Sequence, residues 1–194
     1  MDKLEIVKQY LVKNDAVIFA KAVNINLLNQ TDRLAYVMKN RSDNDKIKKI
    51  VRLHNLSFTE KQYYLSILGD AKVDFNIKKL QLLDDCNKTL FSLASLENEA
   101  DSELVQNYLS GLLIYLARNY KINLASLVAT NIYKKIGSIS LLNNYTEFLF
   151  LNMREDGAIG VLNPLNKNQF SESEYQKWQY ANTIFSYVYL KQVF

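Results

Sequence analysis

Glycine and proline are scarce in this chain, which has five glycines and one proline among 194 residues. Sheets with tight hairpins need these residues in their turns, so the scarcity argues against a β-rich fold. Hydrophobic residues make up 48% of the chain and charged residues 23%, as is typical of proteins that fold around a core. We therefore predict one all-α domain over residues 1–194, built as an array of antiparallel helical hairpins.

Cysteine and long apolar runs are also lacking. Cys86 is the only cysteine, so no internal disulfide can form. The longest apolar stretches, such as residues 148–151, are far shorter than the roughly 18 residues that a membrane-spanning helix needs. The first residues show no basic segment followed by a long apolar run, so no secretory signal is predicted. We therefore expect a cytoplasmic protein without a membrane span.

Motifs of the common enzyme classes are missing as well. Asp84 and Asp85 are adjacent, but Lys88 stands where a magnesium-binding D-D-x-x-D motif needs its last carboxylate. Cys86 and His54 are the only residues of their kinds and lie far apart in the sequence, so they support neither a zinc site nor a nucleophile–base pair. No phosphate-binding glycine loop is present. The motifs therefore predict no catalytic residue, no metal site and no cofactor.

Apolar residues recur instead at helical spacing along most of the chain. Ser57-x-x-Glu60 has the spacing of a capping box, in which two side chains satisfy each other's backbone amides, and Gly69 suits the left-handed end of the same helix. Residues 76–96 predict one long helix or two shorter ones, and the last helix is predicted over residues 173–193. Similar aromatic–leucine segments recur at the spacing of helical-hairpin repeats.

The net charge of +4 arises within residues 39–54, and the rest of the chain is balanced. The basic patch of this region consists of Lys46, Lys48, Lys49 and Arg52. Such a patch can contact phosphate groups or an acidic peptide. The alternative is an ordinary solvated helix face, with Ile47, Ile50 and Val51 turned toward the core.

Two of the five glycines and the only proline lie together in residues 154–166, between two aromatic-rich segments. In such a turn an aspartate can accept backbone hydrogen bonds, glycines permit positive φ or a close approach, and a proline prevents continuation of the preceding helix. The residues of this structural turn are Asp156, Gly157, Gly160 and Pro164. We expect the turn to position the last helix. The alternative is a binding mouth lined by Arg154, Glu155 and Asp156.

Aromatic residues surround the axis of the last helix instead of following one stripe. A helix that is apolar all round is either buried or bound to a partner. One interpretation is a core helix whose tyrosine hydroxyls find hydrogen-bond partners. The other is an aromatic groove that receives a peptide or another subunit, with Trp178, Tyr180 and Tyr187 as candidate binding residues.

The segment EFLFLNMREDGAIG resembles the ends of inner helices in α/α-toroid proteins, the group that includes terpenoid cyclases and protein prenyltransferase β-subunits. In that group a helix runs into a Q-x-x-D-G-x-x-G turn. The matching residues are Asp156, Gly157 and Gly160, while Asn152 or Met153 replaces the glutamine. The resemblance covers about residues 145–190 and implies a partial α/α toroid. It concerns architecture rather than activity.

Together these features favour a non-catalytic helical binding or scaffold protein that holds a peptide or a partner protein. A specific version is an accessory protein of a bacterial peptide-modification or antagonist system, and a homo-oligomer is compatible with the sequence. One alternative is a toroid-type enzyme with a carboxylate-lined pocket. Its acidic residues would be Glu147, Glu155, Asp156 and Asp84 or Asp85. The least favoured alternative is a nucleic-acid-binding regulator that uses the basic patch, because no helix-turn-helix glycine pattern accompanies it.

Overall fold

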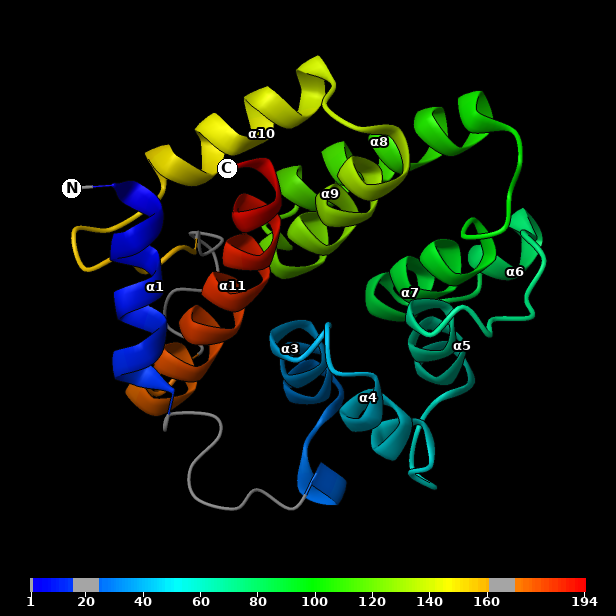
Figure 1. Ribbon diagram of the computed structural model, residues 1–194, viewed down its shortest axis with the longest axis horizontal. Helices are drawn as coiled ribbons and strands as arrows, with labels where there is room; N and C mark the ends of the chain where they lie inside the picture. Colours follow the sequence, from blue (N-terminus) through cyan, green and yellow to red (C-terminus); the bar gives the residue numbers. More distant parts are fainter. Residues whose placement is uncertain (1, 16–24, 161–169) are drawn as a thin grey trace.

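The computed structural model describes residues 2–15, 25–160 and 170–194, which form ten α-helices, one short 3-10 helix and no strand (Figure 1). The predicted all-α fold class is confirmed. None of these helices combines the length and the apolar character that crossing a membrane requires. The elements are α1 (Lys3–Asn14), η1 (Ile25–Leu27), α3 (Gln30–Lys39), α4 (Asn44–Val51), α5 (Phe58–Ile67), α6 (Ile77–Leu80), α7 (Asp85–Ser95), α8 (Ser102–Arg118), α9 (Ile122–Ile136), α10 (Ser140–Leu151) and α11 (Glu172–Val193).

Helix α11 is the central element, and it packs against α9, α1 and α3 (Figure 1). Every side chain from Gln179 to Ser186 is buried, on all sides of the helix axis. Two of its tyrosine hydroxyls find partners: Tyr189 Oη lies 2.8 Å from Thr146 Oγ1 on α10, and Tyr180 Oη donates to Asp15 Oδ1 at 2.8 Å. This environment accounts for the aromatic residues that surround the helix axis.

Helices that follow one another in sequence pack as pairs in α4–α5, α6–α7 and α8–α9. Other contacts join helices that are not consecutive, as between α9 and α11 and between α5 and α7 (Figure 1). Hairpin pairing therefore accounts for part of the packing, and the arrangement as a partial toroid stays a prediction.

Local signals in the sequence account for several helix boundaries. α5 begins with the predicted capping box, in which Glu60 N donates to Ser57 Oγ at 3.2 Å and Ser57 N donates to Glu60 Oε2 at 3.3 Å. Gly69 follows this helix with a φ of 81°. The stretch predicted over residues 76–96 divides into α6 and α7, because the Asp84 side chain accepts a backbone hydrogen bond at 2.8 Å and caps a new helix.

A buried ion pair fixes α3 against α5. Arg33 Nε and Nη2 donate to the two carboxylate oxygens of Glu60 at 2.9 and 3.0 Å, and both side chains are almost fully buried. Arg33 also donates to the Leu28 carbonyl, and the Tyr64 hydroxyl donates to Glu60 Oε1 at 3.2 Å. Because a bidentate pair is directional, it holds α3 in one orientation relative to the core.

The turn after α10 packs against the N-terminal helix. Gly157 has a φ of 91°, and a Cβ atom at this position would lie 2.4 Å from the carbonyl oxygen of Ile6. Asp156 Oδ1 accepts a backbone hydrogen bond within the turn at 3.1 Å. Ile159 N donates to Thr183 Oγ1 on α11 at 2.9 Å. The turn therefore holds α1 and α11 side by side.

Candidate binding cavity

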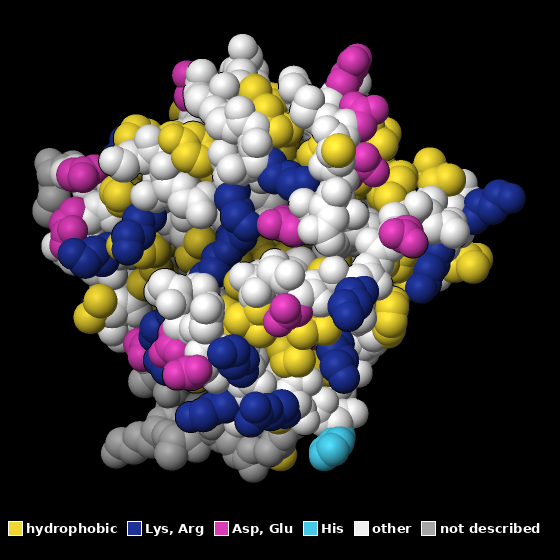
Figure 2. Space-filling model, turned by 45° about the vertical axis from the view of Figure 1, so that its right-hand side comes forward, with side chains coloured by type: hydrophobic (Ala, Val, Ile, Leu, Met, Phe, Trp, Pro, Cys, Tyr) yellow, Lys and Arg dark blue, Asp and Glu magenta, His cyan; other side chains and the backbone are white. Residues whose placement is uncertain are grey.

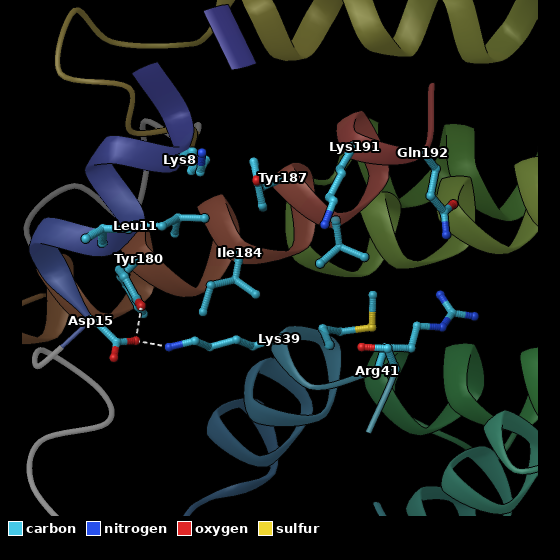
Figure 3. A pocket seen from close by; sticks show the side chains of 14 residues that line it. Lys8, Leu11, Asp15, Lys39, Arg41, Tyr180, Ile184, Tyr187, Lys191 and Gln192 are labelled. Atoms are coloured by element: carbon cyan, nitrogen blue, oxygen red, sulfur yellow. Dashed lines mark hydrogen bonds and ion pairs between the residues drawn. The ribbon is translucent and has the colours of Figure 1, made fainter. Parts of the chain in front are cut away.

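A cavity of about 680 Å³ lies between α1, α3 and α11 (Figure 3). Ligand-binding pockets typically have volumes of roughly 300–1,000 Å³. Most of the exposed wall is apolar. The lining residues are Lys8, Leu11, Val12, Asp15, Met38, Lys39, Arg41, Ser42, Tyr180, Ile184, Tyr187, Val188, Lys191 and Gln192.

Helical spacing brings these residues together, because steps of three or four residues place side chains on one face of a helix. α11 contributes a stripe that consists of Tyr180, Ile184, Tyr187 and Lys191. α1 and its C-cap contribute a second stripe that consists of Lys8, Leu11 and Asp15. Met38 and Lys39, at the end of α3, complete the wall. The cavity therefore lies where three helix faces meet.

A clasp of hydrogen bonds joins the three helices at one end of the cavity. Tyr180 Oη donates to Asp15 Oδ1 at 2.8 Å, and Lys39 Nζ forms an ion pair with the same carboxylate (Figure 3). Burial alone would raise the pKa of Asp15, but the hydrogen bonds from Lys39 and Tyr180 lower it overall. Burial and the neighbouring Asp15 carboxylate raise the pKa of Tyr180. The clasp is therefore a carboxylate held by a hydrogen bond from Tyr180 and an ion pair with Lys39.

Positive charge exceeds negative charge around the cavity, where Asp15 is the one carboxylate among the described lining residues. The cations of the wall are Lys8, Lys39, Arg41 and Lys191. Lys191 extends toward α3, and within the described ranges no hydrogen-bond or ion-pair partner is found for it (Figure 3). Arg41 Nη2 donates to Asn131 Oδ1 at 3.5 Å, whereas Arg41 Nη1 is buried and has no partner in the described part of the chain.

Tyr180 and Tyr187, two of the residues considered for binding from the sequence, line the cavity. Trp178 does not line it. Its ring stacks on Tyr175 with 5.8 Å between the ring centroids. A Cβ atom added at Gly160 would lie 3.0 Å from the indole, so the close approach at this glycine is to an aromatic side chain.

Arg154, Glu155 and Asp156 are exposed on the turn and do not line the cavity. Arg154 Nε lies 3.7 Å from Asp156 Oδ1. Burial, and then the charge of Asp156, raise the pKa of Tyr10 on α1 to about 12, which reflects how close the turn lies to that helix. Pro164, the remaining turn residue, lies outside the described residues.

The basic patch lies on and just after α4. Its residues Lys46, Lys48, Lys49 and Arg52 are all exposed, and none of them lines the cavity. Ile47 and Ile50, on the opposite face of the helix, are fully buried. Lys46 Nζ pairs with Asp43 at 3.4 Å. Figure 2 shows Lys and Arg side chains on the lower part of its face, near the single histidine and with acidic side chains close by. This arrangement is typical of a solvated amphipathic helix.

The acidic residues of the enzyme alternative do not line this cavity. Asp84 caps α7, Asp85 accepts a hydrogen bond from the Tyr115 hydroxyl at 3.0 Å, and Glu147 is exposed on α10. Within the described ranges, no three His, Cys, Asp or Glu side chains lie where they could hold a metal ion. Burial, and then the charge of Asp84, raise the pKa of Cys86 to about 12, which favours the protonated thiol over the nucleophilic thiolate at neutral pH.

Sequence reasoning did not identify Lys8, Asp15 or Lys191 as site residues. A signal for Lys191 was present, because it continues the spacing of Tyr180 and Tyr187 along one face of the last helix. No comparable signal joins Lys8 to Lys191, since only the packing of α1 against α11 brings the two ends of the chain together.

Comparison with known proteins finds no relative from which a function could be transferred: the chain matches no protein family model, no curated protein and no solved structure. The resemblance of the turn to α/α-toroid proteins therefore stays a prediction. The functional interpretation rests on the cavity itself.

Proposed function

We propose that this protein is a non-catalytic helical binding protein, which holds a peptide segment of a partner protein in the cavity between α1, α3 and α11. The observation that carries the proposal is the composition of the wall. Leu11, Ile184 and Val188 offer apolar surface, and Tyr187 adds an aromatic ring with a polar tip. Sites that bind peptides and small ligands combine such apolar anchors with a few polar groups.

The clasp supports a cavity that exists before the ligand arrives. Asp15, Lys39 and Tyr180 tie the ends of α1 and α3 to α11, so the walls keep their separation. A preformed site spares the ligand the cost of ordering the protein, and more of the contact energy then appears as affinity.

The wall also supports binding rather than chemistry. General acid–base catalysis usually draws on histidine or on paired carboxylates. Among the described residues that line the cavity, Asp15 is the one carboxylate, and none of them is a histidine or a cysteine. The Asp15 carboxylate is already engaged by two donors.

A broader form of this proposal places the protein in the cytoplasm, as an accessory protein of a bacterial peptide-modification or antagonist system. The support for this form is the toroid-like turn at residues 147–160, since toroids enclose an apolar concavity suited to peptides or lipids. The turn takes part in building the cavity, because it holds α1 beside α11.

The proposal can be tested by selecting peptides from a random display library on the immobilised protein and measuring their affinity for cavity variants. Val188→Trp and Val12→Trp place an indole in the cavity, and Val12 is 74% exposed, so its replacement leaves the core intact. The matched control is Leu151→Trp, because Leu151 is 84% exposed on α10 outside the cavity.

We expect peptides to be enriched, and we expect both cavity variants to weaken their binding while Leu151→Trp leaves it unchanged. Failure to enrich any peptide would overturn the proposal. Enriched peptides that bind the two cavity variants as well as the wild type would overturn it too.

A further inference from the structure

The surplus of positive charge around the cavity indicates the charge of its ligand. Four cations line a wall whose one carboxylate, Asp15, is already paired with Lys39 and hydrogen-bonded to Tyr180. Lys8 pairs at 3.2 Å with Glu5, which is not one of the residues that line the cavity. The positive charge that no acidic group of the wall balances therefore lies mainly at Lys191 and Arg41.

The wall of the cavity also contains two buried polar atoms next to each other. Arg41 Nη1 and Gln192 Oε1 are both buried, and neither has a hydrogen-bond partner in the described part of the chain. Figure 3 shows the Gln192 amide nitrogen turned toward the guanidinium. A half-turn of this amide would pair Oε1 with the guanidinium without any ligand, so these two atoms alone specify no ligand. Lys191 would still lack a partner.

We propose that the ligand of the cavity is an acidic peptide segment, whose apolar side chains lie on Leu11, Ile184 and Val188 and whose carboxylates pair with Lys191 and Arg41. This inference rests on the proposed function and specifies its partner. Charge-assisted hydrogen bonds to carboxylates are strong where apolar walls exclude water.

The distribution of the cations distinguishes a peptide from other anionic ligands. They come from α1, α3, the residues after α3, and α11, so they surround the apolar wall instead of gathering at one end. A fatty acid has one carboxylate and would leave most of these cations unbalanced. A nucleic acid would present phosphates to an apolar wall that offers them no hydrogen bonds. A peptide that mixes Asp or Glu with apolar residues matches both the apolar wall and the cations that surround it.

The test uses peptides recovered in the selection described for the proposed function. Each is synthesised twice with a fluorescent label, once as recovered and once with every Asp and Glu replaced by Asn or Gln. Fluorescence anisotropy then gives the affinity of each pair for the wild type, for Lys191→Glu and for Lys48→Glu. Lys48→Glu is the matched control, because it changes the net charge equally at an exposed position outside the cavity.

We expect the acidic form to bind about tenfold more tightly than the amide form, with a preference that weakens as salt is added. Lys191→Glu should abolish this preference, and Lys48→Glu should keep it. Recovered peptides that bind in the cavity with equal affinity in both forms would overturn the inference and leave the proposed function standing. An equal loss in Lys48→Glu, or displacement of the peptide by dodecanoate at lower concentration than by the unlabelled peptide, would also overturn it.

Discussion

Positive charge gathers in two regions of this protein, on α4 and around the cavity between α1, α3 and α11. On α4 the cations are neighbours in the sequence, and they project into solvent above the buried Ile47 and Ile50. Around the cavity they come from both ends of the chain and from the end of α3, and they surround apolar surface. The segment richest in cations along the sequence is therefore α4, whereas the cations that surround apolar surface lie at the cavity.

The two regions also differ in what a ligand would gain from them. Exposed lysines on α4 are screened by water and salt, so each contributes little to binding. In the cavity a ligand would displace water from an apolar wall, and the attraction between charges would increase as water leaves. Both gains occur together only in the cavity, which is why we place the binding site there.

Breaking the buried ion pair between Arg33 and Glu60 should have the largest effect on stability, and it should disturb the cavity through α3. Glu60→Ala leaves the Arg33 guanidinium buried without its carboxylate, which should lower the free energy of unfolding by about 3–5 kcal/mol. Because α3 carries Met38 and Lys39, peptide binding should be lost as well. Chemical denaturation and fluorescence anisotropy measure the two effects.

The control for this prediction is the double variant Arg33→Leu with Glu60→Leu, which removes the uncompensated charge. It should be clearly more stable than Glu60→Ala. If the two variants were equally unstable, the uncompensated charge of Arg33 would not be the cause of the loss in Glu60→Ala.

Replacing Gly157 should have the next largest effect, because the turn holds α1 against α11. Gly157→Ala puts a Cβ atom 2.4 Å from the Ile6 carbonyl oxygen at a φ of 91°, and we expect a loss of about 2–4 kcal/mol in unfolding free energy. Gly69→Ala is the matched control, since Gly69 has a φ of 81° with open space around it. Its loss should be only about 1–2 kcal/mol. Equal losses in the two variants would show that the contact with α1 is unimportant.

Removing the charge of Asp15 should have a smaller effect that depends on pH. The pKa of Asp15 is lowered from its ordinary value of 3.8, so its contribution is complete above that pH and is lost as the pH falls through the lowered pKa. Asp15→Asn should cost about 1 kcal/mol or less at neutral pH, because the side chain is 44% exposed. Denaturation at several pH values should show the gap between wild type and variant closing below pH 3.8. A difference in unfolding free energy that grows as the pH falls would show that the charge of Asp15 does not stabilise the clasp.

Neutralising the basic patch should have the smallest effect. A variant with glutamine at Lys46, Lys48, Lys49 and Arg52 should change the free energy of unfolding by less than about 0.5 kcal/mol per site, because these side chains are solvated. Affinity for the selected acidic peptides should stay close to that of the wild type. A large loss of affinity would move the binding site from the cavity to α4.

Much of the fold could be predicted from the sequence, because its signals are local. The capping box of Ser57 and Glu60 and the glycine at position 69 define α5 through backbone hydrogen bonds within a few residues. Apolar spacing also gives the last helix, which is predicted over residues 173–193 and observed as Glu172–Val193. The break before α7 was less clear, since Asp84 stops a pattern that otherwise continues through residues 76–96.

The cavity could be predicted only in part, because it depends on packing between distant segments. Tyr180 and Tyr187 stood out as aromatic residues of a helix that is apolar all round, and both line the wall. Trp178 shows the same pattern but faces Tyr175 and Gly160. Lys8 and Asp15 join the cavity wall only because α1 packs against α11, so their spacing in the sequence does not predict this position.

The central claim is that the cavity, and not α4, receives an acidic peptide. Methyl NMR on isoleucine-labelled protein tests this directly, because Ile184 lines the cavity while Ile47 and Ile50 lie beneath the basic face of α4. We predict that a selected acidic peptide shifts the methyl signal of Ile184 and leaves those of Ile47 and Ile50 in place. Shifts at Ile47 and Ile50 with an unchanged Ile184 would contradict the account.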